Sequence, residues 1–216
     1  MDKDEICVIF ISLIFLIILM TSIHVDEESA LIVVDIQNDF TPGGALPVKG
    51  GDEVIGPMNA YIRLFKKKGR PIIFTRDWHP PNHVSFKDRG GPWPPHCVQG
   101  TKGAEFHPAL KLPDDAVIIS KGFDPEKEAY SGFAGTNLSE VLKAMRIRKL
   151  FIGGLATDYC VKNTVIDALN EGFFVYFLSD ASKGVDVSVG DSEKAMEEMV
   201  LSGARIVKMS DVAGFI

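Results

Sequence analysis

Residues 30–35 read ALIVVD, a continuous apolar run that ends at an aspartate. A strand with one solvated face would alternate polar and apolar residues, so an unbroken run indicates a strand buried on both faces. Similar runs follow at Pro71–Thr75, Ala116–Ser120, Lys149–Gly153, Phe173–Leu178 and Arg205–Met209. Helical patterns lie between them, over Val54–Lys68, from a cap at Thr136 or Asn137 through Met145, over Tyr159–Asn170 with Asp158 as its cap, and over Ser192–Leu201. This alternation predicts an α/β domain with a mostly parallel six-stranded sheet covered on both faces.

The composition excludes several classes of protein. The 216 residues are 46% hydrophobic and 24% charged, which suits one medium-sized globular domain with a substantial core. A net charge of −6 gives no electrostatic reason to expect a nucleic-acid binder. The cysteines Cys7, Cys97 and Cys160 form no CxxC pair, so reduced thiols are expected.

The first 25 residues form a separate segment. Ile6 to Val25 contains no Asp, Glu, Lys or Arg, and about 18 apolar residues would make roughly 27 Å of helix, a marginal bilayer span. An uncleaved membrane anchor fits this pattern, and a secretory signal fits less well because the preceding MDKDE is acidic. A misassigned start, with Met20 as the true first residue, is the third alternative. We therefore expect a hydrophobic leader or membrane-anchoring helix in residues 1–25, outside a single domain in residues 26–216.

Three reactive side chains follow predicted strands. Asp35 ends the first run, Lys121 follows the third, and Cys160 follows LFIGG at 150–154 through a short turn. Singly, each has an ordinary explanation: a turn aspartate, a solvated lysine and a small buried cysteine. Because the carboxyl ends of parallel strands meet at one edge of the sheet, we expect the three side chains to converge there.

Such a group suits a cysteine hydrolase. The aligned backbone dipoles at a helix N-terminus and a neighbouring Lys⁺ are both expected to lower the pKa of the Cys160 thiol. Asp35 can take the thiol proton and later hand it to a leaving amine, while backbone amides between Ala156 and Cys160 can stabilise an oxyanion. A Ser-His-Asp hydrolase is not favoured, since the chain has no GxSxG motif.

Asp77, His79 and His96 form a second group. An Asp and a His two residues apart on an extended segment project to the same side, and a later His can complete a set of three ligands. One carboxylate and two imidazoles suit Zn²⁺ or Fe²⁺, with positions left open for water or substrate. His83 is a further candidate ligand, for which a structural role in the loop is an equal alternative.

Five segments of the chain together resemble one family. They are DIQNDFTPGGALPV (35–48), TRDWHPPNHVSF (75–86), GGPWPPHCVQGTKGAEF (90–106), SKGFDPEKEAYSGFAGT (120–136) and GLATDYCV (154–161). They resemble the nicotinamidase branch of the isochorismatase-like cysteine hydrolases, over about residues 29–209. The resemblance implies a three-layer α/β/α fold and hydrolysis of nicotinamide to nicotinate and ammonia in NAD salvage, through a Cys thioester. It also implies pyrazinamide as a second substrate.

The resemblance also implies roles for individual residues. Asp35 matches the catalytic acid/base, Lys121 the lysine of the triad, and Cys160 the nucleophile. Matches to the metal ligands are Asp77, His79 and His96, with His83 at a position that ligates only in some members. One divalent metal is implied, Zn²⁺ first, with Fe²⁺ or Mn²⁺ as alternatives.

For the substrate pocket, the resemblance implies aromatic residues that hold a flat pyridine ring, matched here by Phe40, Trp93 and Tyr130. It also implies a cis peptide in the turn before the nucleophile, here Leu155–Ala156, that aims the amides of Ala156 and Cys160 at the oxyanion.

Two alternative functions stay open beside this one. A related cysteine amidohydrolase could act on a carbamoyl or ureido amide, although relatives of that kind often lack the metal-binding trio. A non-catalytic, membrane-tethered binding protein could retain the pocket, although it would not require Asp35, Lys121 and Cys160 together. The expected partner is a small aromatic amide and no nucleic acid. Membrane association through residues 6–25, a homo-oligomer and the compartment all stay open, since the domain is typical of cytoplasmic enzymes but would be anchored if residues 1–25 are genuine.

Overall fold

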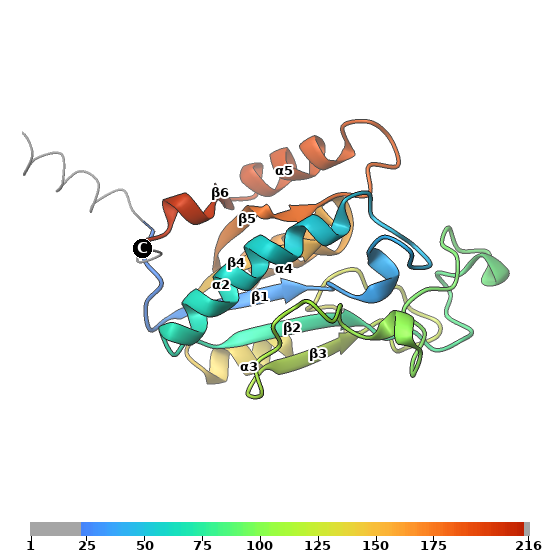
Figure 1. Ribbon diagram of the computed structural model, residues 1–216, viewed down its shortest axis with the longest axis horizontal. Helices are drawn as coiled ribbons and strands as arrows, with labels where there is room; N and C mark the ends of the chain where they lie inside the picture. The colour runs from blue at the N-terminus through green and yellow to red at the C-terminus, as the bar shows by residue number, and fades with distance from the viewer. Residues whose placement is uncertain (1–22, 214–216) are drawn as a thin grey trace, which may run out of the picture.

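The computed structural model describes residues 23–213, and one sheet of six parallel strands organises them (Figure 1). Its spatial order is β3-β2-β1-β4-β5-β6, and every neighbouring pair of strands is parallel. The strands are β1 (Ser29–Val34), β2 (Ile72–Asp77), β3 (Val117–Lys121), β4 (Lys149–Leu155), β5 (Phe174–Lys183) and β6 (Arg205–Val207). All six lie where the apolar runs predict them, and the predicted mostly parallel sheet is confirmed as a fully parallel one.

Helices cover both faces of this sheet, which gives the expected three layers (Figure 1). Helix α2 (Ile55–Lys67) packs on one face, and α3 (Leu138–Ala144), α4 (Lys162–Asn170) and α5 (Asp191–Leu201) pack on the other. Short 3₁₀ turns occur at Asn38–Phe40, Gly51–Val54, Lys87–Arg89, Lys102–Ala104 and Met209–Asp211, and a π-helical turn, Thr157–Val161, leads directly into α4.

Burial of β1 explains its uninterrupted apolar sequence. Leu31 and Val33 belong to the core on the α2 side, whereas Ile32 and Val34 belong to the core on the side of α3 and α4. All six residues of the strand are buried. A polar residue facing either side of the sheet here would therefore lie in one of the two cores, where it would lack hydrogen-bonding partners.

Two local expectations differ from the structure. Strand β5 continues to Lys183, five residues beyond the predicted end at Leu178, because its later part pairs again with the end of β4 after an irregularity in register. Asp158 does not cap the helix that follows it. Its carboxylate instead accepts hydrogen bonds from the backbone amides of Val185 and Asp186, a segment far along the chain.

The predicted leader falls almost wholly outside the described residues. Within residues 23–213, no helix is both long enough and apolar enough to cross a membrane. Ile23 and Val25 belong to the core on the α2 side, and the backbone of Ile23 bonds to that of Asp211 and Ala213. Packing of the domain thus includes residues on the leader side of the predicted boundary between residues 25 and 26.

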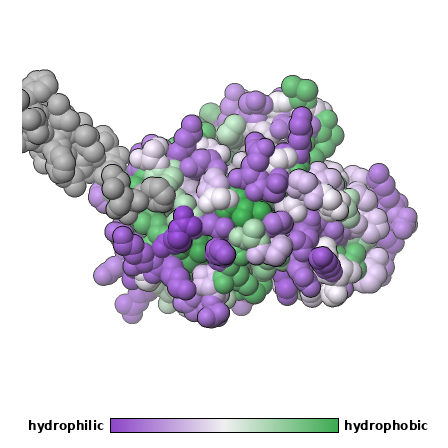
Figure 2. All heavy atoms as spheres, viewed as in Figure 1, coloured by the Kyte–Doolittle hydropathy of each residue, from purple (hydrophilic) through white to green (hydrophobic). Residues whose placement is uncertain are grey.

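The surface of the domain mixes polar and apolar side chains. In the face shown, hydrophilic residues surround small groups of hydrophobic ones (Figure 2). Among the large hydrophobic residues of the described part of the chain, Val189, just before α5, and Leu201, at its C-terminal end, have the largest exposed fractions.

Candidate active site

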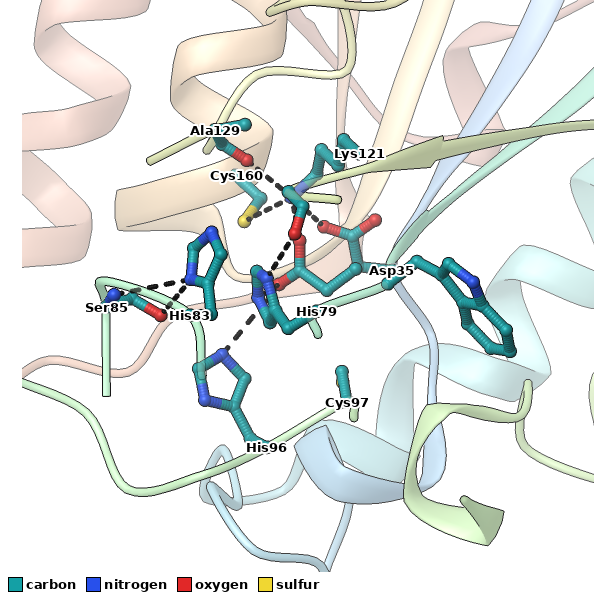
Figure 3. Close-up of polar contacts among 12 residues, drawn as sticks. Asp35, His79, His83, Ser85, His96, Cys97, Lys121, Ala129 and Cys160 are labelled. Carbon is teal, nitrogen blue, oxygen red and sulfur yellow. Dashed lines mark hydrogen bonds and ion pairs between the residues drawn. The ribbon is translucent and has the colours of Figure 1, made fainter. Parts of the chain in front are cut away.

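The candidate residues gather at the carboxyl ends of four adjacent strands, β3, β2, β1 and β4 (Figure 3). Asp35 directly follows β1, Asp77 ends β2, Lys121 ends β3, and Cys160 lies in the turn after β4. The strand order reverses between β1 and β4, because β2 and β3 extend the sheet on one side of β1 and β4 extends it on the other. Crevices at such reversals are where open α/β sheets bind ligands.

Lys121 is the centre of the group. Its ammonium is fully buried and lies 3.0 Å from Asp35 Oδ2, 3.3 Å from Cys160 Sγ and 3.2 Å from the carbonyl oxygen of Ala129. It also donates to the carboxylate of Asp77. Burial opposes a charged amine, but the carboxylates of Asp35 and Asp77 outweigh it and hold the pKa of Lys121 well above its usual value. The lysine is therefore a permanent cation that joins the two groups predicted from the sequence.

Asp35 is fully buried, and its second oxygen has a separate partner. The hydroxyl of Thr75 donates to Asp35 Oδ1 at 2.6 Å, while Oδ2 faces Lys121. The residue has a φ of 47°, in the left-handed region that non-glycine residues seldom occupy. Burial raises the pKa of Asp35 above its ordinary value, against the opposing charge of Lys121. A raised pKa makes this carboxylate a better proton acceptor than an ordinary aspartate, and the protonated group can return the proton.

The expected lowering of the Cys160 pKa is wrong. Burial raises the pKa of this thiol well above its usual value, and the nearby carboxylates of Asp77 and Asp35 add to that effect. Lys121 acts in the opposite direction but does not prevail. The thiol also lies inside the π-helical turn rather than at the start of α4. Cys160 consequently rests as a thiol and needs a base to become a nucleophile.

Asp77, His79 and His96 come together as a buried group of candidate metal ligands. One ligand atom from each lies within 4.8 Å of the others. His79 Nε2 is 3.5 Å and His96 Nε2 is 4.0 Å from Asp77 Oδ2. The Nδ1 atoms point away from this centre, toward the carbonyl oxygens of Gly122 at 2.9 Å and Pro94 at 2.8 Å. A backbone carbonyl on Nδ1 leaves Nε2 as the ligand atom, which is the usual arrangement behind metal-binding histidines.

His83 lies beside this group without completing it. Its ring packs on that of His79, with the centroids 4.2 Å apart. Both of its ring nitrogens have protein partners, however, since Nδ1 lies 2.7 Å from Ser85 Oγ and Nε2 lies 3.0 Å from the carbonyl oxygen of Lys127. His83 would have to give up one of these bonds to ligate a metal.

The two groups open into one small cavity. Its walls include the predicted aromatic residues Phe40, Trp93 and Tyr130, together with Asp77, His96 and Cys160. The indole nitrogen of Trp93 donates to the hydroxyl oxygen of Tyr130 at 3.0 Å, which fixes the two rings relative to each other. The cavity volume is about 30 Å³, so a six-membered ring enters only when wall side chains move.

Four walls of the cavity are absent from the sequence-based prediction: Leu46, Val48, Tyr159 and Val185. Tyr159 directly precedes the candidate nucleophile, and this position in the sequence could have indicated that it lines the cavity. Its ring makes an edge contact with Trp93, with centroids 5.1 Å apart. The other three are aliphatic residues of loops, and nothing in their local sequence distinguishes them from ordinary packing residues.

The turn before Cys160 has the expected backbone form. The peptide between Leu155 and Ala156 is cis, as the resemblance implies. The amides of Tyr159 and Val161 both donate to the carbonyl oxygen of Ala156. Ala156 and Cys160 themselves line the cavity, where the amides proposed for the oxyanion belong.

Comparison with known proteins gives the class to which this fold and site belong. The model of the isochorismatase domain family matches residues 29–211. The chain therefore belongs to the isochorismatase family.

Individual relatives narrow this class. The chain is 41% identical to the nicotinamidase of Acinetobacter baylyi, with 86% of this chain and 95% of that protein covered. The chain is also 57% identical in sequence to the pyrazinamidase of Pyrococcus horikoshii, whose crystal structure was solved in complex with zinc. That structure matches with a TM-score of 0.81 and covers 84% of this chain and 99% of its own. PnC1 from L. infantum, whose structure was solved in complex with nicotinate, is 34% identical in sequence to this chain. The TM-score is 0.81, and the match covers 89% of this chain and 98% of that one.

Proposed function

We propose that this protein is a nicotinamidase, a hydrolase of linear amide C–N bonds that converts nicotinamide to nicotinate and ammonia, with pyrazinamide as a second substrate. The observation that carries the proposal is one cavity that contains Cys160, the Asp77–His96 side of the candidate metal group, and an aromatic wall. The relatives named above support the substrate class. They give no support to a non-catalytic, membrane-tethered binding protein.

In this proposal, Asp77, His79 and His96 hold one divalent metal ion, and we propose Zn²⁺. The donor set of one carboxylate and two imidazoles fits the group, since both imidazoles keep Nε2 directed toward the carboxylate. When bound, the ion would supply an open coordination position for the ring nitrogen of a pyridine amide. The zinc complex of the Pyrococcus relative supports this assignment.

Asp35, Lys121 and Cys160 carry the chemistry. Asp35 takes the proton from Cys160 Sγ, and the thiolate attacks the carboxamide carbon, whose oxygen becomes an oxyanion held by the amides of Ala156 and Cys160. The C–N bond then breaks, Asp35 returns the proton to the leaving nitrogen, and ammonia departs from a thioester. A water molecule deprotonated by Asp35 attacks the thioester, which releases nicotinate and restores the thiol.

The electrostatics of the buried group support this sequence of steps. Burial raises the pKa of Asp35, which makes it a better proton acceptor, and burial also raises the pKa of Cys160, which therefore needs such a base. Lys121 stays charged throughout, and it lies within 3.3 Å of both the thiol sulfur and the Asp35 carboxylate. It therefore stabilises whichever of the two carries the negative charge.

The catalytic unit that we propose is the domain in residues 26–216, because every proposed catalytic and metal-binding residue lies between Asp35 and Cys160. The leader in residues 1–25 would then play no part in the chemistry.

Ammonia release from nicotinamide by the purified, zinc-supplemented protein tests the proposal. We expect Cys160→Ala to lose at least about a thousandfold in kcat, as nucleophile removal does in other hydrolases. Cys97→Ala is the matched control, because Cys97 is also a buried free cysteine but lines no part of the cavity. It should retain activity. A folded, metal-containing wild-type protein that releases no ammonia would contradict the assignment, and a carbamoyl or ureido amide would then be the substrate to test.

A further inference from the structure

Val185 lines two separate spaces, the active-site cavity and a neighbouring groove. It lines the cavity together with Cys160, and it also lines a larger groove of about 660 Å³ on its other side. Thr157, three residues before the nucleophile, lines the groove as well. The segment around Val185 and the turn before Cys160 therefore border both the small cavity and the large groove, and we call them the partition between the two.

The backbone of this partition is fixed by the turn that carries the nucleophile. Asp158 is buried, and its two carboxylate oxygens accept the amides of Val185 at 2.9 Å and Asp186 at 2.8 Å. A carboxylate that receives two backbone amides makes a strong, directional attachment. Val185 is consequently held by a residue that stands two positions before Cys160.

The partition is fixed a second time on the side of α5. The carboxylate of Asp186 accepts both the amide and the hydroxyl of Ser192, each at 2.8 Å. Gly184 leaves no room for a side chain there, since an added Cβ would lie 1.8 Å from Ser192 Oγ. Val185 is thus placed between two attachments, one to the nucleophile's turn and one to the first turn of α5.

We propose that Val185 sets the size limit of the substrate ring and that Asp158 is the positioning residue that holds it in place. This inference rests on the proposed amide hydrolysis. The cavity of about 30 Å³ has no spare volume for a second ring, whereas the groove beyond Val185 has ample volume. Removing the two methyl groups of Val185 joins the two spaces, and the enzyme then accepts amides of fused bicyclic rings.

The test compares kcat/KM for nicotinamide with kcat/KM for two bicyclic amides, quinoline-3-carboxamide and isoquinoline-4-carboxamide, which carry the added ring on different edges. We expect Val185→Ala to raise the ratio of bicyclic to nicotinamide kcat/KM by at least about tenfold for one of them, since one or two methyl groups in a pocket discriminate by that amount. Val185→Phe should lower kcat/KM for nicotinamide by more than about tenfold. Val187→Ala is the matched control, because Val187 is 67% exposed and lines neither space.

The positioning role of Asp158 has its own readout. Asp158→Asn replaces one of the two acceptor oxygens with a donor that faces a backbone amide. We expect a raised KM for nicotinamide, a smaller change in kcat, and a raised bicyclic ratio. Asp191→Asn is the control, because Asp191 also accepts a backbone amide, that of Ser188 in the same loop, but not the amide of Val185. A lowered kcat with unchanged KM and ratio would assign Asp158 a purely structural role.

The outcomes separate this inference from the proposed function. If the wild-type protein hydrolyses nicotinamide and both Val185 variants leave the ratio unchanged, the size limit lies elsewhere and the inference is wrong. If the wild-type protein does not hydrolyse nicotinamide at all, the proposed function itself is wrong.

Discussion

Asp35, Asp77 and Lys121 stand on the ends of three parallel strands, whereas Trp93, His96 and Val185 stand on loops outside the sheet. We call the first set the strand-end half of the site and the second the loop half. The strand-end residues are fixed by the hydrogen bonds of the sheet, and their charged groups contact one another directly. The loop residues are held by scattered contacts instead: the amide of Val185 donates to the Asp158 carboxylate, and Trp93 shares backbone hydrogen bonds with Ser85 and Lys87. We propose that the strand-end half, together with Cys160, carries the chemistry and that the loop half governs the choice of substrate.

Removing the central cation should break the strand-end half most severely. Lys121→Met leaves the buried carboxylates of Asp35 and Asp77 without their shared partner, and we expect the free energy of unfolding to fall by about 3–5 kcal/mol. Urea denaturation measures this change. Lys127→Met removes an exposed, surface-paired lysine and should cost less than about 1 kcal/mol. Adding Asp35→Asn to Lys121→Met should recover part of the loss, and a fully additive double variant would contradict this account.

Removing a proposed metal ligand should lower the zinc affinity of the protein, whereas removing the neighbouring His83 should not. We expect His79→Ala to weaken zinc binding by more than about a hundredfold, above the loss typical of residues that only support a ligand. His83→Ala should change zinc affinity by less than about tenfold, because both of its ring nitrogens already bond to protein groups. Competition titration against a zinc chelator gives both values. Equal losses in the two variants would make His83 a ligand and enlarge the metal group.

The pH dependence of activity sharpens the description of Asp35. Thr75 donates to the charged carboxylate and so lowers the pKa of Asp35, which burial raises. Losing the bond in Thr75→Val should therefore raise that pKa further, and the acid limb of kcat/KM should move to higher pH by about one to two units. Thr75→Ser keeps the hydroxyl and should keep the wild-type profile. An acid limb that stays in place or moves downward in Thr75→Val would exclude Asp35 as the base.

The smallest effect is expected in the loop half. Trp93→Phe and Tyr130→Phe each remove the bond between the indole and the phenol, and each should raise KM a few-fold with little change in kcat. A double-mutant cycle on kcat/KM should give a coupling of about 0.5–1.5 kcal/mol, the usual net value of a neutral hydrogen bond. A coupling near zero would mean that the two rings contact the substrate independently.

The same division explains what the sequence could predict. The strands follow from their unbroken apolar runs, and the side chains near their ends follow from the geometry of parallel sheets, so Asp35, Lys121 and Cys160 could be placed together in advance. Val185 could not, because its position depends on a bond from Asp158, which local sequence presents as a helix cap. The pKa direction of Cys160 was missed because it depends on the depth of burial and on two carboxylates brought close by folding.

The position of β1 has a consequence for biosynthesis. It is the first strand of the sheet to be made, yet in the finished sheet it lies between β2 and β4. A ribosome that has released β1, β2 and β3 has supplied every residue of the strand-end half, but one edge of β1 has no partner until Lys149–Leu155 emerges. An unpaired edge on an apolar strand is prone to pair with other chains. The insertion of β4 therefore closes that edge, and Cys160, the proposed nucleophile, follows directly in the turn after β4. A nascent chain thus gains this thiol as the open edge of β1 becomes paired.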